Sequence, residues 1–111
     1  MLVDDDVDFH RAARELFTIR GYSVLCEAGC TATALSVVRH HAPDVVVVDV
    51  HLGRESGFDL ARELTREHPG LAVVLMSADK DAGGAEHVRA SGARGFLPKL
   101  QITKLDLREL L

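Results

Sequence analysis

Short, wholly apolar runs alternate along the chain with longer segments in which apolar residues recur at every third or fourth position. The apolar runs predict β-strands, and the spaced segments predict amphipathic helices. Strands are expected at residues 2–3, 22–25, 45–48, 71–76 and 95–97. Helices are expected at residues 7–20, from 31 or 33 to 41, and at 58–67, 85–90 and 101–111.

Helix boundaries and the central strand support this division. Gly21, Pro43 and Gly92 stand where predicted helices end, and glycine and proline are the usual stop signals there. Side chains able to cap a helix start precede two of the helices, namely Asp6 or Asp8 and Thr31 or Thr33. The run at 45–48 is four valines, and a strand apolar on both faces is typical of a parallel sheet covered by helices on both sides. Five strand–helix pairs therefore predict an α/β fold with a doubly wound parallel sheet.

Composition narrows the class of protein. The chain has 111 residues and 12.1 kDa, which fits one domain over residues 1–111. A net charge of −4 argues against direct contact with nucleic acid, because phosphates require a basic face. No apolar run approaches the roughly 20 residues of a membrane span, and the acidic start is unlike a secretory leader, so we expect a cytoplasmic protein. Cys26 and Cys30 have no histidine pair at ligand spacing and are expected to be reduced thiols.

Polar residues stand at the carboxyl ends of the predicted strands, where sheets of this kind bind their ligands. They are Asp4, Asp5 and Asp6 after the first strand, Asp49 after the third, Ser77 after the fourth and Lys99 after the fifth. Carboxylates gathered at one edge repel one another, and a hard cation such as Mg²⁺ relieves that repulsion. Lys99 offers a charge for a phosphate oxygen, and Ser77 offers a hydroxyl donor. Asp49, ending the most buried strand, is the candidate nucleophile for an aspartyl phosphate.

Taken in order, these motifs resemble the receiver domain of bacterial two-component response regulators. The resemblance covers essentially the whole chain and is carried by Val3-Asp4-Asp5, Pro43-Asp44 with the four valines and Asp49, Gly57, Met76-Ser77-Ala78, and Gly95-Phe96-Leu97-Pro98-Lys99. It implies a flavodoxin-like doubly wound sheet of five parallel strands in the order 2-1-3-4-5. It also implies a phosphoacceptor in signal transduction, with no enzyme activity beyond self-catalysed phosphotransfer and autodephosphorylation.

The resemblance also implies roles for individual residues. Asp49 would accept a phosphoryl group from a sensor histidine kinase or phosphotransfer protein. The implied Mg²⁺ ligands are Asp5 and Asp49 directly, Asp4 through water, and the backbone carbonyl of His51. Lys99 would pair with the phosphoryl oxygens. Ser77 and Phe96 would be switch residues, and their movement would change the face of the fourth helix, fifth strand and fifth helix, through which a receiver homodimer is possible.

Some positions depart from the family pattern, and other functions stay open. Leu100 follows Lys99 where the family commonly has proline, and Phe96 replaces a frequent tyrosine. The main alternative is a phosphorylation-independent, receiver-like interaction module. A Mg²⁺-dependent phosphatase would usually need a second acid where His51 stands, and a flavodoxin-like cofactor binder would need a first loop that attracts phosphate. We expect the side chains of His51 and Asp79 to influence the attack of water on the phosphoryl group.

Overall fold

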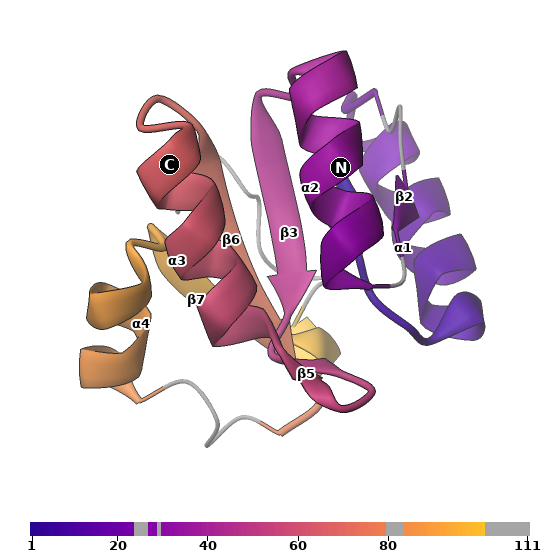
Figure 1. Cartoon of the computed structure of the whole chain (residues 1–111). Helices are drawn as coiled ribbons and strands as arrows, with labels where there is room; N and C mark the ends of the chain where they lie inside the picture. Colours follow the sequence, from indigo (N-terminus) through magenta and orange to yellow (C-terminus); the bar gives the residue numbers. More distant parts are fainter. Residues whose placement is uncertain (24–26, 29, 80–83, 102–111) are drawn as a thin grey trace.

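A sheet of five parallel strands forms the centre of the protein (Figure 1). The computed structural model describes residues 1–23, 27–28, 30–79 and 84–101. In spatial order the strands are β2 (Glu27–Ala28), β1 (Leu2–Val3), β3 (Val45–Asp49), β6 (Ala72–Ser77) and β7 (Gly95–Pro98). Numbered within this sheet alone, the order reads 2-1-3-4-5, and every neighbouring pair is parallel. The predicted α/β fold is confirmed.

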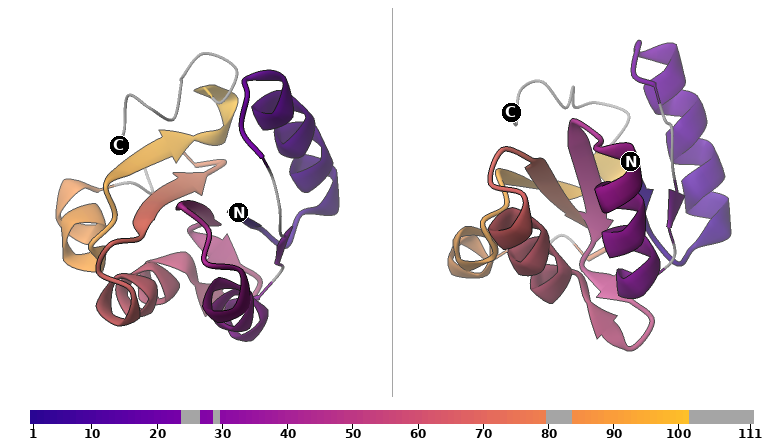
Figure 2. Two further views of the ribbon diagram at one scale, coloured as in Figure 1. Left: turned by 90° about the horizontal axis from the view of Figure 1, so that it is seen from above. Right: turned by 45° about the horizontal axis from the view of Figure 1, so that its top comes forward.

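Helices cover both faces of the sheet. They are α1 (Val7–Ile19), α2 (Thr31–His41), α3 (Gly57–Glu67), α4 (Ala85–Ser91) and the short 3-10 helix η2 (Lys99–Gln101). Figure 2 shows α1 on one side of the sheet and α2 with α3 on the other. Within the part of the chain described, none of the helices is both long enough and apolar enough to span a membrane.

The core has two halves because successive side chains of a strand point to opposite faces. Val46 and Val48 face the half beneath α2 and α3, whereas Val47 faces the half beneath α1. The first half also contains Val3, Ala34, Val38, Val50, Leu52, Leu60, Ala61, Leu64, Val73 and Leu75. The second also contains Leu2, Ala13, Phe17, Val74, Met76 and Leu97. Each fully buried valine or leucine stabilises the fold by roughly 1.5–3 kcal/mol, so this two-sided burial holds β3 and its terminal Asp49 rigidly.

The helix starts differ in how well the sequence predicts them. Asp6 caps α1 as expected, and its carboxylate accepts the backbone N–H groups of Asp8 and Phe9, each at 3.1 Å. The prediction that Thr31 or Thr33 caps α2 is wrong. The N-cap residue of α2 is Cys30, and its side chain makes no capping hydrogen bond. Instead the N–H of Thr31 donates to the Glu55 carboxylate at 3.1 Å, a contact from a distant segment that local sequence does not reveal.

Two strand predictions also need correction. Among the described residues the second strand is at Glu27–Ala28; of the residues 22–25 expected to form it, 22 and 23 lie in no strand, and 24 and 25 fall outside the described residues. The segment after Asp49, for which the sequence predicts neither strand nor helix, contains an antiparallel hairpin, β4 (His51–Leu52) with β5 (Glu55–Ser56). Gly53 allows the tight turn, because its φ of 61° lies in the left-handed region. The predicted terminal helix at 101–111 lies outside the described residues except for Gln101, which ends η2.

The half-buried thiol of Cys30 leads to a prediction about its titration. Its Sγ lies 3.2 Å from Thr33 Oγ1, and hydrogen bonds from Thr33 lower the pKa of Cys30 below its ordinary value. In a Cys26→Ser background, we therefore expect the rate of alkylation by iodoacetamide to rise with pH around a midpoint below that of a free thiol. Thr33→Val should move this midpoint upward. An unchanged profile in the Thr33→Val variant would refute the contact.

Candidate functional site

Three carboxylates meet at the carboxyl ends of the neighbouring strands β1 and β3. Strand pairing matches Val3 with Val48, so Asp4, the next residue, comes to lie beside Asp49. Asp5 follows in the turn that leads into α1. Carboxylate oxygens of Asp4, Asp5 and Asp49 all lie within 4.8 Å of one another; Asp4 and Asp49 are buried, and Asp5 is exposed. Buried anions gathered in this way need a compensating cation.

Lys99 supplies part of that compensation. Its Nζ lies 2.7 Å from Asp4 Oδ2 and 2.9 Å from Asp49 Oδ2. Burial alone would lower the pKa of Lys99, but the two carboxylates raise it above its ordinary value. Burial raises the pKa of Asp4, and the contact with Lys99 offsets this only in part. One ammonium facing three carboxylates leaves an excess of negative charge, which favours binding of a cation.

Backbone N–H groups fix the carboxylates and the neighbouring hydroxyl. Asp6 donates its N–H to Asp4 Oδ1 at 2.9 Å, and His51 donates its N–H to Asp49 Oδ1 at 3.1 Å. The N–H of Asp79 donates to Ser77 Oγ at 3.0 Å. Each of the two buried carboxylates therefore has one oxygen bound to the backbone and the other paired with Lys99.

The remaining predicted site residues lie around this centre. Ser77 is buried at the end of β6, one residue beyond Met76, which is paired with Asp49. His51 lies on β4 with an exposed side chain. Phe96 is half-buried and packs against the core beneath α2 and α3, whereas the next residue, Leu97, faces α1. The structure thus brings Asp4, Asp5, Asp49 and Lys99 together and places the proposed switch residues on the two neighbouring strands.

Sequence reasoning did not identify the role of Phe9. It was predicted only as part of the apolar face of the first helix. In the structure Lys99 Nζ lies 4.2 Å from the centroid of the Phe9 ring, a cation–π distance. A single sequence carries no signal for this contact, because the two residues come from opposite ends of the described chain.

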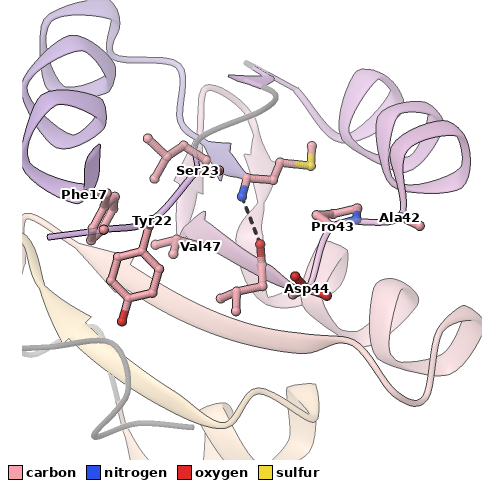
Figure 3. Close-up of a pocket in the computed structure, with 11 residues that line it drawn as sticks. Phe17, Tyr22, Ser23, Ala42, Pro43, Asp44 and Val47 are labelled. Carbon is pink, nitrogen blue, oxygen red and sulfur yellow. Dashed lines mark hydrogen bonds between the residues drawn. The ribbon is translucent and has the colours of Figure 1, made fainter. Parts of the chain in front are cut away.

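A pocket of about 340 Å³ lies at the other edge of the sheet, at the amino ends of β1 and β3 (Figure 3). Phe17, Tyr22 and Asp44 are among the residues that line it. Within it the amino terminus of Met1 donates to the carbonyl of Val45 at 2.9 Å. The length of β3 separates this pocket from Asp49, so it takes no part in the chemistry of the carboxylates.

Comparison with known proteins identifies the family. The family model described as response regulator receiver domain matches residues 1–111. The chain belongs to this family. The receiver domain is 32% identical over 101 residues to the response regulator GacA of Pseudomonas aeruginosa, an alignment covering 89% of this chain and 47% of GacA. It is 27% identical over 99 residues to the transcriptional regulatory protein PdtaR of Mycobacterium tuberculosis, covering 89% of this chain and 48% of PdtaR. The receiver domain thus spans about half the length of these curated relatives.

Solved structures agree with this family. The receiver domain aligns with a two-component response regulator of the LuxR family from Aurantimonas sp. SI85-9A1 at a TM-score of 0.81 and 29% identity, covering 99% of this chain and 76% of that one. It aligns with the receiver domain of NtrX from Brucella abortus at a TM-score of 0.78 and 26% identity, covering 98% and 88%. Membership of this family favours a signalling role over the phosphatase and the flavodoxin-like cofactor binder.

Proposed function

We propose that this receiver domain accepts a phosphoryl group on Asp49 from the phosphohistidine of a sensor histidine kinase or a phosphotransfer protein. The observation that carries this proposal is the convergence of two buried carboxylates and one lysine at the end of β3, with Asp49 Oδ2 only 2.9 Å from Lys99 Nζ. A carboxylate held rigidly beside a cation suits in-line phosphoryl transfer, which depends mainly on positioning and charge neutralisation.

The residues at the site fit Mg²⁺. Carboxylate and carbonyl oxygens are its preferred protein ligands, and Asp5, Asp49 and the backbone carbonyl of His51 would supply them, with Asp4 acting through water. Bound Mg²⁺ neutralises charge on the acceptor carboxylate and on the phosphoryl oxygens. The excess of negative charge around Lys99 supports this assignment, because a second cation removes it.

Phosphotransfer then follows from the positions of the protein groups. An oxygen of Asp49 forms a bond to phosphorus as the phosphorus–nitrogen bond of the phosphohistidine breaks, and the histidine nitrogen leaves with the electron pair. Lys99 pairs with a phosphoryl oxygen. Ser77 turns toward the new acyl phosphate, and Phe96 moves into the space that this opens. We treat the change as a shift between two existing packings of the domain.

The proposed readout surface includes α4 and β7; the helix expected at 101–111 as its third part lies outside the described residues except for Gln101. Such a face could bind a downstream partner or a second receiver as a homodimer. The domain is proposed to act in the cytoplasm without contacting nucleic acid itself. The chain spans about half the length of its curated relatives, so activities that belong to the rest of those proteins are not assigned to this receiver domain.

The test of this function is the intact mass of the protein after incubation with acetyl phosphate, with and without Mg²⁺. We expect a gain of one phosphoryl group that requires Mg²⁺. No gain, together with no effect of Mg²⁺ on the melting temperature, would instead support the phosphorylation-independent interaction module.

His51 and Asp79 lead to a prediction about the lifetime of the phosphoryl group. Both side chains are exposed next to the site, where they can orient or deprotonate an attacking water. A positioned general base contributes at least about 100-fold; for these exposed groups we expect the His51→Ala, Asp79→Ala double variant to lengthen the lifetime only about fivefold. The measurement is loss of phosphoryl mass after acetyl phosphate is removed. An unchanged lifetime would show that neither side chain acts on the water.

A further inference from the structure

The Lys99 side chain is nearly buried, although the residue that follows it in sequence is highly exposed and does not help to bury it. It is only 12% exposed, yet the next residue, Leu100, is 87% exposed. Lys99 also begins η2, so it stands at the junction of a strand and a single turn. The ammonium, at the end of a flexible four-carbon stem, therefore depends on contacts from elsewhere in the fold. Among the described residues these come from Asp4, Asp49 and Phe9.

The ring of Phe9 is itself held in place. Its backbone N–H is bound by the Asp6 carboxylate at 3.1 Å, and the N–H of Asp6 is bound in turn by Asp4 at 2.9 Å. The side chain packs on the core beneath α1, which includes Leu97, two residues before Lys99. The acidic turn, the first turn of α1 and the end of β7 thus form one connected unit. A ring fixed in this way presents a stable face to the ammonium 4.2 Å away.

The three contacts of Lys99 differ in what competes for them. Asp4 and Asp49 bind the ammonium through carboxylate oxygens, the same kind of group that a hard cation requires. An aromatic face attracts an ammonium but is a poor ligand for a hydrated divalent cation. When a cation occupies the carboxylates, the ring is therefore the contact that Lys99 keeps.

We propose that Phe9 is the positioning residue of Lys99, holding the ammonium beside Asp49 through the face of its ring while a divalent cation occupies the carboxylates. The inference rests on the proposed function, because it assigns to Lys99 the task of meeting the phosphoryl group. The contact that the structure gives the Phe9 ring at the site is with Lys99, so the role assigned to Phe9 is to act through Lys99.

A series of substitutions separates this role from simple packing. Phe9→Leu and Phe9→Met keep an apolar side chain but remove the aromatic face, whereas Phe9→Tyr and Phe9→Trp keep it. At saturating Mg²⁺ we expect phosphorylation by acetyl phosphate to slow about threefold to tenfold in the Leu and Met variants. The Tyr variant should be phosphorylated at the rate of the unmodified protein. The Trp variant should have the same rate, provided that urea unfolding shows no loss of stability from the larger ring. Equal rates across the series would overturn the proposal.

A spectroscopic measurement tests the contact without phosphoryl transfer. Protons above an aromatic face are shifted upfield by the ring current, so the ε-methylene protons of Lys99 should resonate upfield of their ordinary position. We expect this shift to persist as Mg²⁺ is added, to remain in Phe9→Tyr and to vanish in Phe9→Leu. Loss of the shift on adding Mg²⁺ would overturn the proposal. A retained shift in a protein that never gains phosphoryl mass would refute the proposed function and leave the positioning role standing.

Discussion

Asp49→Asn is expected to abolish the Mg²⁺-dependent gain of phosphoryl mass. The asparagine side chain fits the same space but has no carboxylate oxygen to form the acyl phosphate, and it removes one of the two carboxylates paired with Lys99. Intact mass after incubation with acetyl phosphate measures this directly. The expected loss is complete, because a side-chain amide at this position cannot form the acyl phosphate, and Lys99 then no longer faces a carboxylate on β3.

A matched control is available on α3. Asp59 is exposed, pairs with Arg62 at 3.2 Å and is not part of the cluster of Asp4, Asp5 and Asp49, so Asp59→Asn should leave phosphorylation unchanged. A phosphoryl gain that survives in Asp49→Asn would move the acceptor to another residue, and peptide mapping would then locate it. Equal losses in both variants would point to a general effect on folding.

Gly57→Ala should destabilise the fold by about 3 kcal/mol and disturb the acceptor as well. A Cβ at residue 57 would collide with the carbonyl oxygen of Asp49, and it would lie 2.7 Å from the Asp49 carbonyl carbon and 2.8 Å from Val50 Cα. These are backbone atoms of the strand end that carries the acceptor, and they cannot rotate away. The N–H of Gly57 also donates to the carbonyl of Val50 at 2.7 Å, so α3 starts directly against this strand.

Urea unfolding measures this effect, and Gly70→Ala is the control. A Cβ at Gly70 would meet nothing within 4 Å, so its substitution should change the free energy of unfolding by no more than about 0.5 kcal/mol. Similar free energies of unfolding for the two variants would contradict the role assigned to Gly57. If Gly57→Ala fails to fold, the same substitution in a background stabilised at another position makes its free energy of unfolding measurable, and it should be lower than that of Gly70→Ala in the same background.

The parts of the fold that follow from local pattern were predictable from the sequence. Four consecutive valines specify a strand buried on both faces, and the spacing of Ala13, Leu16 and Phe17 specifies the inner face of α1. The burial of His10 on the same helix does not follow from the apolar pattern. The β4–β5 hairpin escaped prediction because each of its strands has only two residues, too short for a period to show. The group that caps α2 escaped prediction, although the helix begins at Thr31 as one of the two expected starts, because its first N–H is bound by Glu55, 24 residues away.

Some features of the candidate site were likewise predictable from the sequence, and others were not. The carboxylates were found because strand ends can be read from hydrophobic pattern, and parallel strands bring those ends to one edge. The surroundings of Lys99 were predicted only in part. Its pairing with carboxylates follows from their opposite charges at the same end of the sheet, whereas its contact with Phe9 depends on how α1 packs across that end. Local propensity carries no information on such packing.

The ion pair of Lys99 with Asp49 also bears on synthesis of the protein. The two residues are 50 positions apart, and the other carboxylate partner, Asp4, is near the amino terminus. Contacts this far apart form only when the strands between them are in place. During translation, the acceptor carboxylate of a nascent chain therefore lacks its lysine until the last strand has left the ribosome. We expect premature chains that end before β7 to escape phosphorylation, so that only a fully made receiver can carry a signal.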